Sequence, residues 1–367
     1  LLKEFHLLDF ILVMNVEEAL IDKVMYSTNV ISDIMAIKID TDPACIISTS
    51  GSTGIPKSVV LSHRNIIDFI DWCIDTFTFN QSDVIGSLSP FHFDIYILEL
   101  FVSLSQGSVL HIIPPKESTF PADLVNFLLI NSVTFIFWVP TIMVNISNLD
   151  ILDVIKLSKL KKVFFAGEVF PTKHLNYWRT KLPDAEFVNL YGPIEIAVDC
   201  TYYVVNRFFE DGESVPIGKP CRNTDVIILD SNNKSVKDGG QGELCVRGSS
   251  LSLGYFNNLD QTNKVFVQNP LINSYPEKIY RTGDLVYKNT HGEIMFVGRK
   301  DFQIKHMGYR IELLEIELAA LSMHEVKNAC ILYNNALKQI IMVYESDREL
   351  SDTSIRLKLS SKLPKYM

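Results

Sequence analysis

The sequence lacks any apolar run that reaches the roughly 18 residues a membrane-spanning helix needs, and the stretch "FILVM" at 10–14 is far too short. It also lacks a C-x-x-C pair, because its six cysteines are scattered along the chain. Neither a zinc site nor a disulfide framework is therefore indicated. We expect buried thiols in a reducing compartment, and a cytoplasmic protein with no membrane partner.

Basic residues are also fewer than acidic ones. The chain has 34 basic and 43 acidic residues and a net charge of −9, which argues against broad nucleic-acid binding. Its 367 residues, 47% of them hydrophobic, allow a large core and at least two domains. The chain begins "LLKEF" without Met and stops at "KLPKYM", so we expect it to be truncated at both ends, and a missing targeting signal then carries little weight.

Strand-like and helical patterns alternate from residue 44 to about residue 200, which favours an α/β architecture of sheets layered with helices. The runs "ACIIST" (44–49) and "SVVLS" (58–62) predict two strands, and Ser62 can cap a helix that reaches Phe77. Further strand-like runs are "SVLHII", "VTFIFWVP", "KVFFAGE" and "EFVNLYG".

The pattern of strand-like and helical segments changes after about residue 215. Short strands separated by turn signals predict a small antiparallel sheet or barrel over 215–300. A helix pattern from Leu313 to Leu321 and the strand-like "ACILYN" then predict a small α+β lid. We expect a large domain over 1–300 and a small, mobile domain over 301–367.

Residues 51–58, "GSTGIPKS", match the phosphate-binding G-x-x-x-x-G-K-[ST] loop except that Pro56 replaces the second glycine. Proline removes a backbone donor where the loop needs one and fixes φ near −65°. The residues after Lys57 are strand-like rather than a helix start, which also opposes a P-loop. The strand "VIILD" could be mistaken for a Walker B strand, but "SNNK" after Asp230 indicates a simple turn.

The same stretch can hold phosphates in another way. Five hydroxyl residues and two glycines precede a lysine, and such a loop can wrap phosphates through side chains and glycine amides. A solvated Gly/Ser linker is the alternative, which the strand-like run directly before the loop makes less natural.

Six motifs follow one another in order over about residues 44–367: "TSGSTGIPKSVVLSH", "FHFDIYILELF", "NLYGPIE", "GELCVRGSSLSLGYFN", "YRTGDLV" and "GRKDFQIKHMGYRIELLEIE". Together they resemble those of the adenylate-forming enzymes, specifically the amino-acid adenylation domains of nonribosomal peptide synthesis and stand-alone amino-acid–carrier protein ligases such as D-alanine–carrier protein ligase.

The resemblance implies a two-step reaction. ATP and a carboxylate give an acyl-adenylate and pyrophosphate, and the acyl group then passes to the phosphopantetheine thiol of a carrier protein. The cofactors implied are ATP and Mg²⁺, and the partners are an amino acid and the carrier protein. Catalysis of this kind is mainly positioning and charge neutralisation, because two anions must be held together.

The resemblance also implies residue roles. Thr49, Lys57 and the loop between them would hold the departing pyrophosphate, and Glu195 would bring Mg²⁺ to the phosphates. Tyr191 would stack on adenine, Asp284 would accept hydrogen bonds from the ribose hydroxyls, and Arg299 would add a ribose or phosphate contact. The further nucleotide contacts expected are Ser50, Gly51, Ser52, Thr53, Gly54, Asn189 and Gly192. Taken singly, such an Asp is usually a turn residue and such a Tyr a core residue.

Two positions depart from the family pattern, and one residue is missing. Ile194 stands where the family usually has a threonine whose hydroxyl touches the α-phosphate, and Ser58 stands where glycine is common. Losing one hydrogen bond to a charged group costs about 1.5–3 kcal/mol, which predicts impairment rather than abolition. The family's catalytic lysine would lie just beyond Met367, so we expect the chain as it stands to adenylate poorly.

Asp94 is the main clue to the substrate. By resemblance it would hold the α-ammonium of an amino acid, whereas an N-cap for the following helix is the structural alternative, and both roles can hold at once. The other pocket positions would be Ile95, Leu98, Phe137, Phe164, Ala166, Gly167, Leu190, Val198 and Asp199. Their mostly apolar character favours a small neutral amino acid, proline-like or alanine, whereas Asp199 would favour a polar or cationic side chain if it faces the substrate.

Asp301 would be the hinge about which the small domain rotates, and Gly308 would lie where the pantetheine arm passes. Charged residues at such a junction also suit a solvated linker. Two rival functions stay open. One is an acyl- or aryl-CoA ligase of the same fold, and the other is a catalytically impaired nucleotide-binding relative, which Ile194 motivates.

Overall fold

The structure is a computed structural model that describes residues 32, 35–49, 56–237, 239–300, 303–334 and 337–367. The chain divides into two compact units, Leu1–Asp42 and Pro43–Met367. In the first unit, residues 35–37 are helical and exposed. All elements described below belong to the second unit, inside which the predicted domain division at residue 300 stays a prediction.

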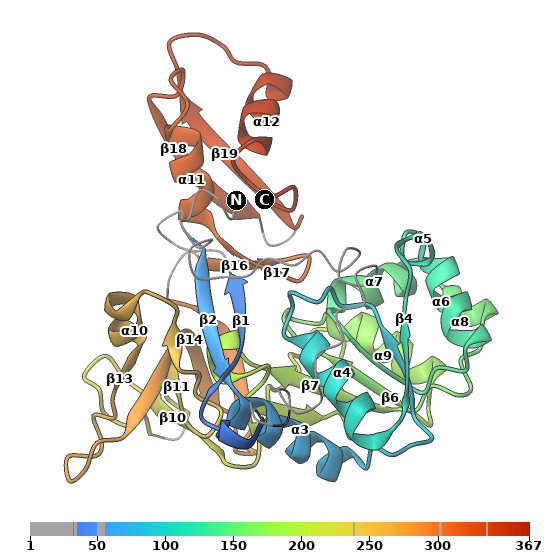
Figure 1. The fold of residues 1–367 in the computed structure, drawn as a ribbon. Coiled ribbons are helices and arrows are strands. Elements are labelled where there is room, and N and C mark those ends of the chain that lie inside the picture. Colours follow the sequence, from blue (N-terminus) through green and yellow to red (C-terminus); the bar gives the residue numbers. More distant parts are fainter. Residues whose placement is uncertain (1–31, 33–34, 50–55, 238, 301–302, 335–336) are drawn as a thin grey trace. The chain divides into compact units, whose positions relative to one another are not determined.

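The largest sheet has seven strands in the order β4-β3-β5-β6-β7-β8-β9 (Figure 1). The strands β4, β3, β5, β6 and β7 are parallel, whereas β8 and β9 are antiparallel to their neighbours. The bounds are β3 Val84–Ser87, β4 Val109–Ile112, β5 Phe135–Trp138, β6 Lys162–Phe165, β7 Glu186–Tyr191, β8 Thr201–Val204 and β9 Lys219–Pro220. The predicted α/β layering is therefore confirmed, including the four strand-like runs between residues 108 and 192.

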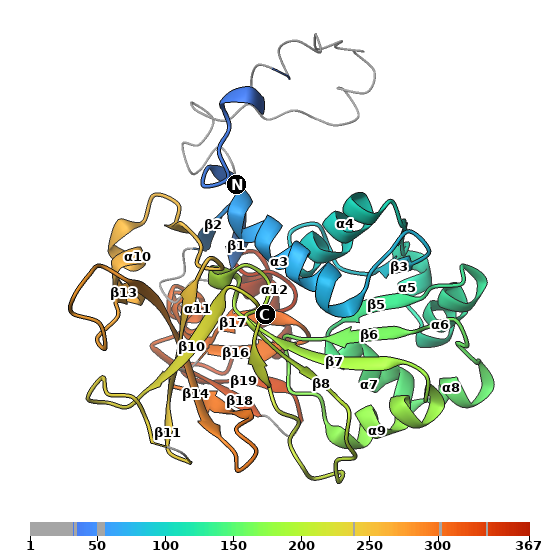
Figure 2. The same cartoon turned by 90° about the horizontal axis from the view of Figure 1, so that it is seen from below.

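Helices cover both faces of this sheet, with α3 and α4 on one side and α7 and α9 on the other (Figure 2). Side chains that alternate along a strand enter different cores. Phe164 of β6 packs with residues of α3 and α4, whereas Val163 and Phe165 pack with α6, α7 and α9. The helices are α3 His63–Phe77, α4 Ile95–Gln106, α5 Pro115–Ser118, α6 Pro121–Ile130, α7 Pro140–Asn148, α8 Ile151–Val154 and α9 Thr172–Lys181.

The phosphate-loop candidate connects two strands of a small antiparallel sheet, β1 (Pro43–Thr49) and β2 (Lys57–Ser62), which β12 (Gly254–Tyr255) completes. The strand after the loop confirms that Lys57 does not start a helix. Ser62 caps α3 through a reciprocal capping box with Asn65, as its position before the helical pattern predicts. Among the helices of the described residues, none combines the length and the apolar character that a membrane crossing requires.

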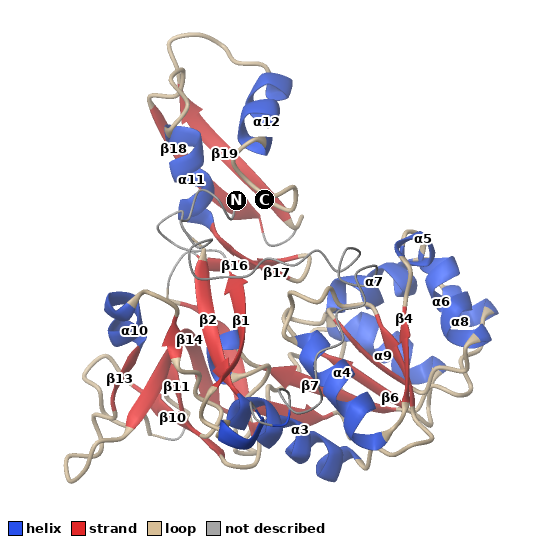
Figure 3. Ribbon diagram, in the orientation of Figure 1, coloured by secondary structure: helices blue, strands red, loops and turns tan. Residues whose placement is uncertain are grey.

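A five-stranded antiparallel sheet follows and carries one short helix, α10 (Figure 3). Its elements are β10 Thr224–Leu229, β11 Gln241–Gly248, α10 Leu259–Val265, β13 Phe266–Gln268, β14 Lys278–Lys288 and β15 Ile294–Arg299. Asp230 accepts hydrogen bonds from the backbone N–H groups of Asn232 and Lys234, at 2.8 and 2.9 Å. It is thus the turn residue that the sequence indicates rather than part of a Walker B strand.

The last elements are two antiparallel strand pairs and two helices. They are β16 Gln303–His306, β17 Tyr309–Glu312, α11 Leu313–Leu321, β18 Asn328–Asn334, β19 Gln339–Glu345 and α12 Asp352–Ser360. The predicted helix 313–321 and the strand at 329–334 are confirmed. The predicted hinge residue, Asp301, lies outside the described residues.

Candidate active site

Glu195 is fully buried in a short 3₁₀ helix, η2 (Ile194–Ile196), that follows β7. Its Oε1 accepts a hydrogen bond from the Tyr255 hydroxyl at 2.7 Å, and its Oε2 accepts one from Arg310 Nη1 at 2.7 Å. Burial alone would raise the pKa of Glu195, but the Arg310 guanidinium outweighs it and holds that pKa below the ordinary value. The carboxylate is therefore ionised and already faces a cation.

Lys57 and Thr49 stand opposite each other where β1 and β2 meet the loop. The Thr49 hydroxyl donates to the Lys57 carbonyl at 3.4 Å, and the Lys57 ammonium pairs with Glu312 Oε1 at 3.2 Å. The expected loop contacts Ser50, Gly51, Ser52, Thr53 and Gly54 lie outside the described residues. The described part of the loop thus presents one largely buried lysine that is engaged by a carboxylate.

Asp284 contacts two other predicted nucleotide residues, Tyr191 and Arg299, at the junction of β7, β14 and β15. The Tyr191 hydroxyl donates to Asp284 Oδ2, and Arg299 Nη1 donates to Asp284 Oδ1 at 2.7 Å. Burial, reinforced by the Asp284 carboxylate, raises the pKa of Tyr191 well above its ordinary value, so this phenol stays a donor. Asn189 lies nearby on β7 and donates to the Pro216 carbonyl at 2.8 Å.

Asp94 is the N-cap of α4, because its Oδ1 accepts a hydrogen bond from the Ile95 N–H at 3.0 Å. The structural alternative for this residue is therefore confirmed. Burial raises the pKa of the Asp94 carboxyl to about 6, and the positive charge of Lys305 opposes that rise. The half-buried carboxyl keeps one oxygen, Oδ2, that the capping bond does not use, so the cap and an ammonium contact can coexist.

Seven of the predicted pocket residues belong to one hydrophobic cluster above the face of the sheet covered by α3 and α4. Phe137, Phe164 and Leu190 come from the adjacent parallel strands β5, β6 and β7, and Ile95 and Leu98 come from α4. Phe164 is fully buried against Phe77, with ring centroids 4.6 Å apart. The cluster members are Ile95, Leu98, Phe137, Phe164, Ala166, Leu190 and Val198. Gly167 follows Ala166 in the loop after β6.

Asp199 is buried beside this cluster, and its Oδ2 has no hydrogen-bond partner within the described residues. Burial and the nearby Asp94 carboxylate raise the pKa of Asp199 well above its ordinary value, against the opposing charge of Lys305. Two acidic groups thus influence each other in one largely apolar site.

At Gly192, the backbone that follows β7 packs closely against the backbone of Val198 and Asp199. A Cβ on Gly192 would lie 2.4 Å from Asp199 Cα and 2.6 Å from the Val198 carbonyl oxygen. Because these are backbone atoms, they cannot yield as a flexible side chain would.

We therefore expect Gly192→Ala to lower the free energy of unfolding by about 1–3 kcal/mol, through overpacking. Urea unfolding of both proteins measures this difference. Gly212→Ala is the matched control, because no heavy atom lies within 4 Å of the Cβ it would add. Equal stability of the two variants would contradict the close approach at Gly192.

Ile194 is buried in the same cluster as the pocket residues, where its side chain packs among apolar groups. The isoleucine in place of the family's threonine thus fits its apolar surroundings in this chain. It opens η2, in which Glu195 follows directly after it.

The sequence-based assignment missed three polar residues that contact predicted site residues. Tyr255 and Arg310 hold Glu195, and Glu312 holds Lys57. All three lie inside motifs that were quoted for the resemblance, "GYFN" and "GYRIE". The alternation of Arg310 and Glu312 along a strand was the available signal that both side chains share one face.

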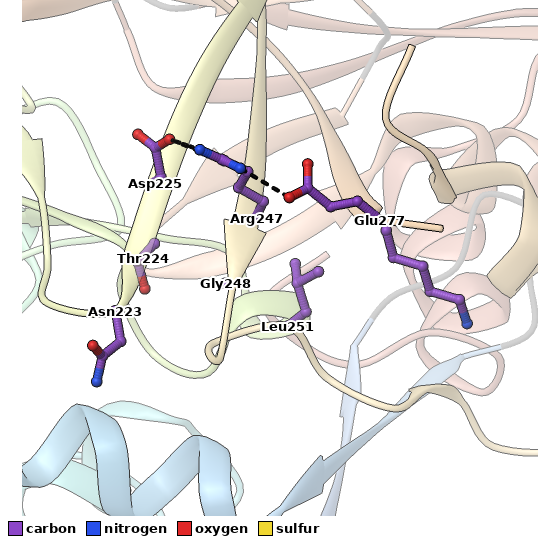
Figure 4. Close-up of a pocket in the computed structure, with 8 residues that line it drawn as sticks. Asn223, Thr224, Asp225, Arg247, Gly248, Leu251 and Glu277 are labelled. Carbon is purple, nitrogen blue, oxygen red and sulfur yellow. Dashed lines mark hydrogen bonds and ion pairs between the residues drawn. The ribbon is translucent and has the colours of Figure 1, made fainter. Parts of the chain in front are cut away.

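A separate hollow of about 580 Å³ lies over β10 and β11, and none of the residues that line it is a predicted site residue (Figure 4). Its central cation, Arg247, points between Asp225 and Glu277 and pairs with each of them at 2.8 Å. The positive charge is therefore already balanced by two carboxylates, and the hollow offers no excess charge for an anion.

Glu195 offers carboxylate oxygens that a hard cation such as Mg²⁺ prefers, but no complete set of metal ligands surrounds it among the described residues. Within the described residues no group of three or more His, Cys, Asp or Glu side chains could hold a metal ion. Mg²⁺ commonly uses one or two carboxylates together with substrate phosphates and water, so Glu195 alone is compatible with it. Arg310 would have to leave Oε2 first.

The chain matches the family described as "AMP-binding enzyme" over residues 15–256. It is 33% identical over 337 residues to zwittermicin A synthase ZmaJ of Bacillus cereus, covering 89% of this chain and 63% of the relative. It is 32% identical over 341 residues to the L-proline–[L-prolyl-carrier protein] ligase of Pseudomonas fluorescens, covering 91% and 64%. The chain thus spans under two thirds of the length of these curated relatives.

Solved structures show the same fold. The adenylation domain AlmE of Vibrio cholerae, in complex with glycyl-adenosine-5'-phosphate, has a TM-score of 0.80 and 25% identity over 91% of this chain and 64% of that chain. IdnL1 has a TM-score of 0.79 and 26% identity over 89% and 66%.

Proposed function

The chain belongs to the family of AMP-binding enzymes, and from that premise we propose that it activates the carboxylate of an amino acid with ATP. A carboxylate oxygen forms a bond to the α-phosphorus, the bond from that phosphorus to the β-phosphate oxygen breaks, and pyrophosphate leaves. The products are an aminoacyl-adenylate and pyrophosphate. The similarity to a prolyl-carrier protein ligase and to a structure with a bound glycyl-adenylate supports this choice.

The observation that carries the proposal is that residues predicted to line the pocket lie together near the carboxyl ends of adjacent parallel strands. Ligands of open α/β sheets bind at this edge. Phe137, Phe164 and Leu190 come from adjacent strands here, and Asp94 caps the helix beside them. An apolar wall with the carboxyl groups of Asp94 and Asp199 beside it suits an amino acid whose ammonium meets Asp94 and whose side chain meets the wall.

For the nucleotide, the pairing of Tyr191, Asp284 and Arg299 supports a ribose and adenine site. Asp284 would exchange the Tyr191 and Arg299 contacts for the ribose hydroxyls, and the Tyr191 ring would lie on adenine. Lys57 and Thr49, with the loop between them, would hold the β- and γ-phosphates. When bound at Glu195, Mg²⁺ would neutralise phosphate charge, while Tyr255 keeps the carboxylate oriented.

The substrate class we propose is a small neutral amino acid, proline-like or alanine. Phe137 and Phe164 are both fully buried in the same cluster as Ile95, the residue after Asp94, so the side chains expected to surround the substrate are large and apolar. Asp199 would then turn away from the substrate or be protonated, as its raised pKa favours. A cationic substrate would instead require Asp199 ionised and facing it.

A second step would transfer the aminoacyl group to a carrier protein. The phosphopantetheine thiol sulfur would bond to the carbonyl carbon, AMP would leave, and the thiol proton would pass to solvent. The tip of the β16–β17 hairpin would border the path of such a thiol, and its Gly308 N–H donates to Glu168 Oε1 at 2.9 Å. A Cβ on Gly308 would lie 2.9 Å from a Val139 methyl, so glycine permits this approach. Rotation of residues 301–367 about Asp301 would separate the two steps.

The direct test is amino-acid-dependent ATP–pyrophosphate exchange by the full-length protein across all proteinogenic amino acids. We expect exchange above background with proline, alanine or a similarly small residue. Exchange only with fatty or aryl acids would replace this function by an acyl- or aryl-CoA ligase, the rival of the same fold.

The second candidate, an impaired nucleotide-binding relative, is favoured by the buried Ile194. We expect Ile194→Thr to raise the exchange rate about tenfold, because the new hydroxyl can donate to the α-phosphate. The same change should lower the free energy of unfolding by about 1 kcal/mol or more, since a hydroxyl enters an apolar cluster. Exchange kinetics and urea unfolding measure the two effects.

Ile196→Thr is the matched control, since Ile196 is buried in the same 3₁₀ helix but in a different cluster. It should lose stability without gaining rate. If neither the parent nor Ile194→Thr exchanges with any carboxylate while ATP still binds, the non-catalytic relative is the correct description.

A further inference from the structure

Asp284, which is predicted to contact the ribose, lies in an irregular part of strand β14. The register between β11 and β14 shifts between Glu243 and Cys245 of β11. Within this shift β11 has the single residue Leu244, whereas β14 has three residues, 282–284. The excess of β14 residues forms a β-bulge, a feature that re-aims side chains next to binding sites. The direction of the Asp284 carboxyl therefore depends on what holds this bulge.

Glu243 of the neighbouring strand binds the bulge directly. Its side chain is 7% exposed, and its Oε1 accepts a hydrogen bond from the Gly283 N–H at 3.1 Å. Gly283 has a φ of +75°, in the left-handed region that favours glycine. A buried carboxylate thus holds the backbone immediately before Asp284.

The other carboxylate oxygen of Glu243 holds two cations from the adjoining segments. Arg281 donates to Oε2 from Nε at 2.9 Å and from Nη2 at 2.7 Å, and Lys300 Nζ donates to the same oxygen at 3.2 Å. Arg281 directly precedes the bulge. Lys300 directly follows Arg299, which pairs with Asp284 at 2.7 Å. Because hydrogen bonds between charged groups are stronger than neutral ones, Glu243 ties together the two segments that carry Asp284 and its partner.

Thr282 supports the bulge from within. Its hydroxyl donates to the Leu244 carbonyl at 2.7 Å and accepts a hydrogen bond from the Asp284 N–H at 3.0 Å. Thr282 is 2% exposed, so its hydroxyl exchanges these bonds for water only if the bulge opens. The backbone on both sides of Gly283 is therefore held by side chains as well as by strand pairing.

We propose that Glu243 is a positioning residue for nucleotide binding, because it holds the bulge that aims the Asp284 carboxyl at the ribose hydroxyls. The proposal rests on the proposed function in one respect, since it takes Asp284 as the ribose contact. Glu243 does not contact the nucleotide in this scheme. It acts through the Gly283 backbone and the Arg281 side chain on the direction of Asp284.

Glu243→Gln tests this positioning with little change in shape. The carboxylate accepts hydrogen bonds at both oxygens, whereas glutamine has one acceptor oxygen and turns an NH₂ group toward other donors. The bulge should loosen, and we expect the affinity for ATP to fall about tenfold, as for one weakened charge-assisted hydrogen bond. The analogue 2′,3′-dideoxy-ATP lacks both hydroxyls that Asp284 would contact, so its affinity should stay close to the parent value.

The experiment uses calorimetric titration of the full-length protein with each nucleotide, in excess Mg²⁺ and without an amino acid. Thr282→Val is a second variant with the same expected pattern, should Glu243→Gln fold poorly, and urea unfolding checks both folds. In an Asp284→Ala background, Glu243→Gln should no longer change the affinity for ATP, because residues that act through one another are not additive.

Glu277→Gln is the matched control. Glu277 also pairs with an arginine of β11, but its partners are Arg247 and Asn269 rather than the bulge, so both nucleotide affinities should equal those of the parent. If Glu243→Gln and Thr282→Val weaken both nucleotides equally, or if neither variant changes the affinity for ATP, Glu243 does not aim Asp284 and the inference is overturned.

The proposed function can fail separately. If the parent does not prefer ATP to the dideoxy analogue, Asp284 is not the ribose contact, and the inference fails together with that part of the proposed function. A protein that shows the expected nucleotide pattern but catalyses no exchange with any amino acid would support the positioning by Glu243 and overturn the adenylation.

Discussion

Glu195→Gln is expected to lower the free energy of unfolding by about 3 kcal/mol, because it leaves the buried Arg310 guanidinium facing a neutral amide. Removing one partner of a buried ion pair usually costs about 3–5 kcal/mol, and the remaining amide oxygen, which can still accept one hydrogen bond, places this change at the low end. Urea unfolding at pH 7 measures the difference. Adenylation should fall as well, since the carboxylate expected to hold Mg²⁺ is gone.

The double variant Glu195→Gln with Arg310→Met separates the charge effect from general damage. A hydrophobic side chain of similar length buries no unpaired charge, and exchanging a buried pair for apolar groups is often neutral. The double variant should therefore be more stable than Glu195→Gln alone. A cost below about 1 kcal/mol for the single variant would mean that solvent screens the pair as it screens exposed pairs.

The pH dependence has a definite sign. The pKa of Glu195 in the folded protein lies below its ordinary value of 4.5, since Arg310 outweighs burial. Stability from this carboxylate is fully present above pH 4.5 and is lost as pH falls through the lower folded pKa. The stability difference between the parent and Glu195→Gln should therefore be largest near neutrality and shrink below pH 4.

Local patterns in the sequence predicted local structure well. Strand β14 (Lys278–Lys288) lies in the region 215–300 that was predicted to form an antiparallel sheet, and helix α3 starts after its predicted cap, Ser62. Both depend on periodicity and on hydrogen bonds between neighbours, which a single segment already encodes. Asp94 is a further example, because its position directly before a helical pattern predicts an N-cap, and the structure confirms that cap.

Contacts between distant segments could not be predicted in the same way. Arg310 and Glu195 are 115 positions apart, and Lys57 and Glu312 are 255 apart. Which charges meet depends on how β17 packs against η2 and β2, and charge type alone does not specify the partner. The motifs predict that Glu195 and Lys57 contact ligands, and they gave no indication of the protein groups that hold these two side chains.

Asp94→Asn should raise KM for the amino acid in ATP–pyrophosphate exchange about 100-fold or more while KM for ATP changes little. Asparagine caps a helix about as well as aspartate, so α4 keeps its N-terminal hydrogen bond and the variant loses only the charge. An ammonium that enters a half-buried site without a counter-charge loses a charge-assisted hydrogen bond and pays its desolvation. Steady-state exchange kinetics measure both constants, and urea unfolding checks that the cap survives.

The pH profile distinguishes an ammonium contact from a purely structural Asp94. Burial raises the pKa of Asp94 to about 6, against the opposing charge of Lys305, while Glu195 adds a smaller increase. Because only the ionised carboxyl attracts an ammonium, KM for the amino acid should rise about tenfold per pH unit below pH 6 in the parent and stay flat in Asp94→Asn. Asp123→Asn, in the exposed first turn of α6, is the matched control and should keep the parent profile. A KM for Asp94→Asn that equals the parent value at pH 7 would leave capping as the whole role of Asp94 and would move the amino-acid contact elsewhere in the site.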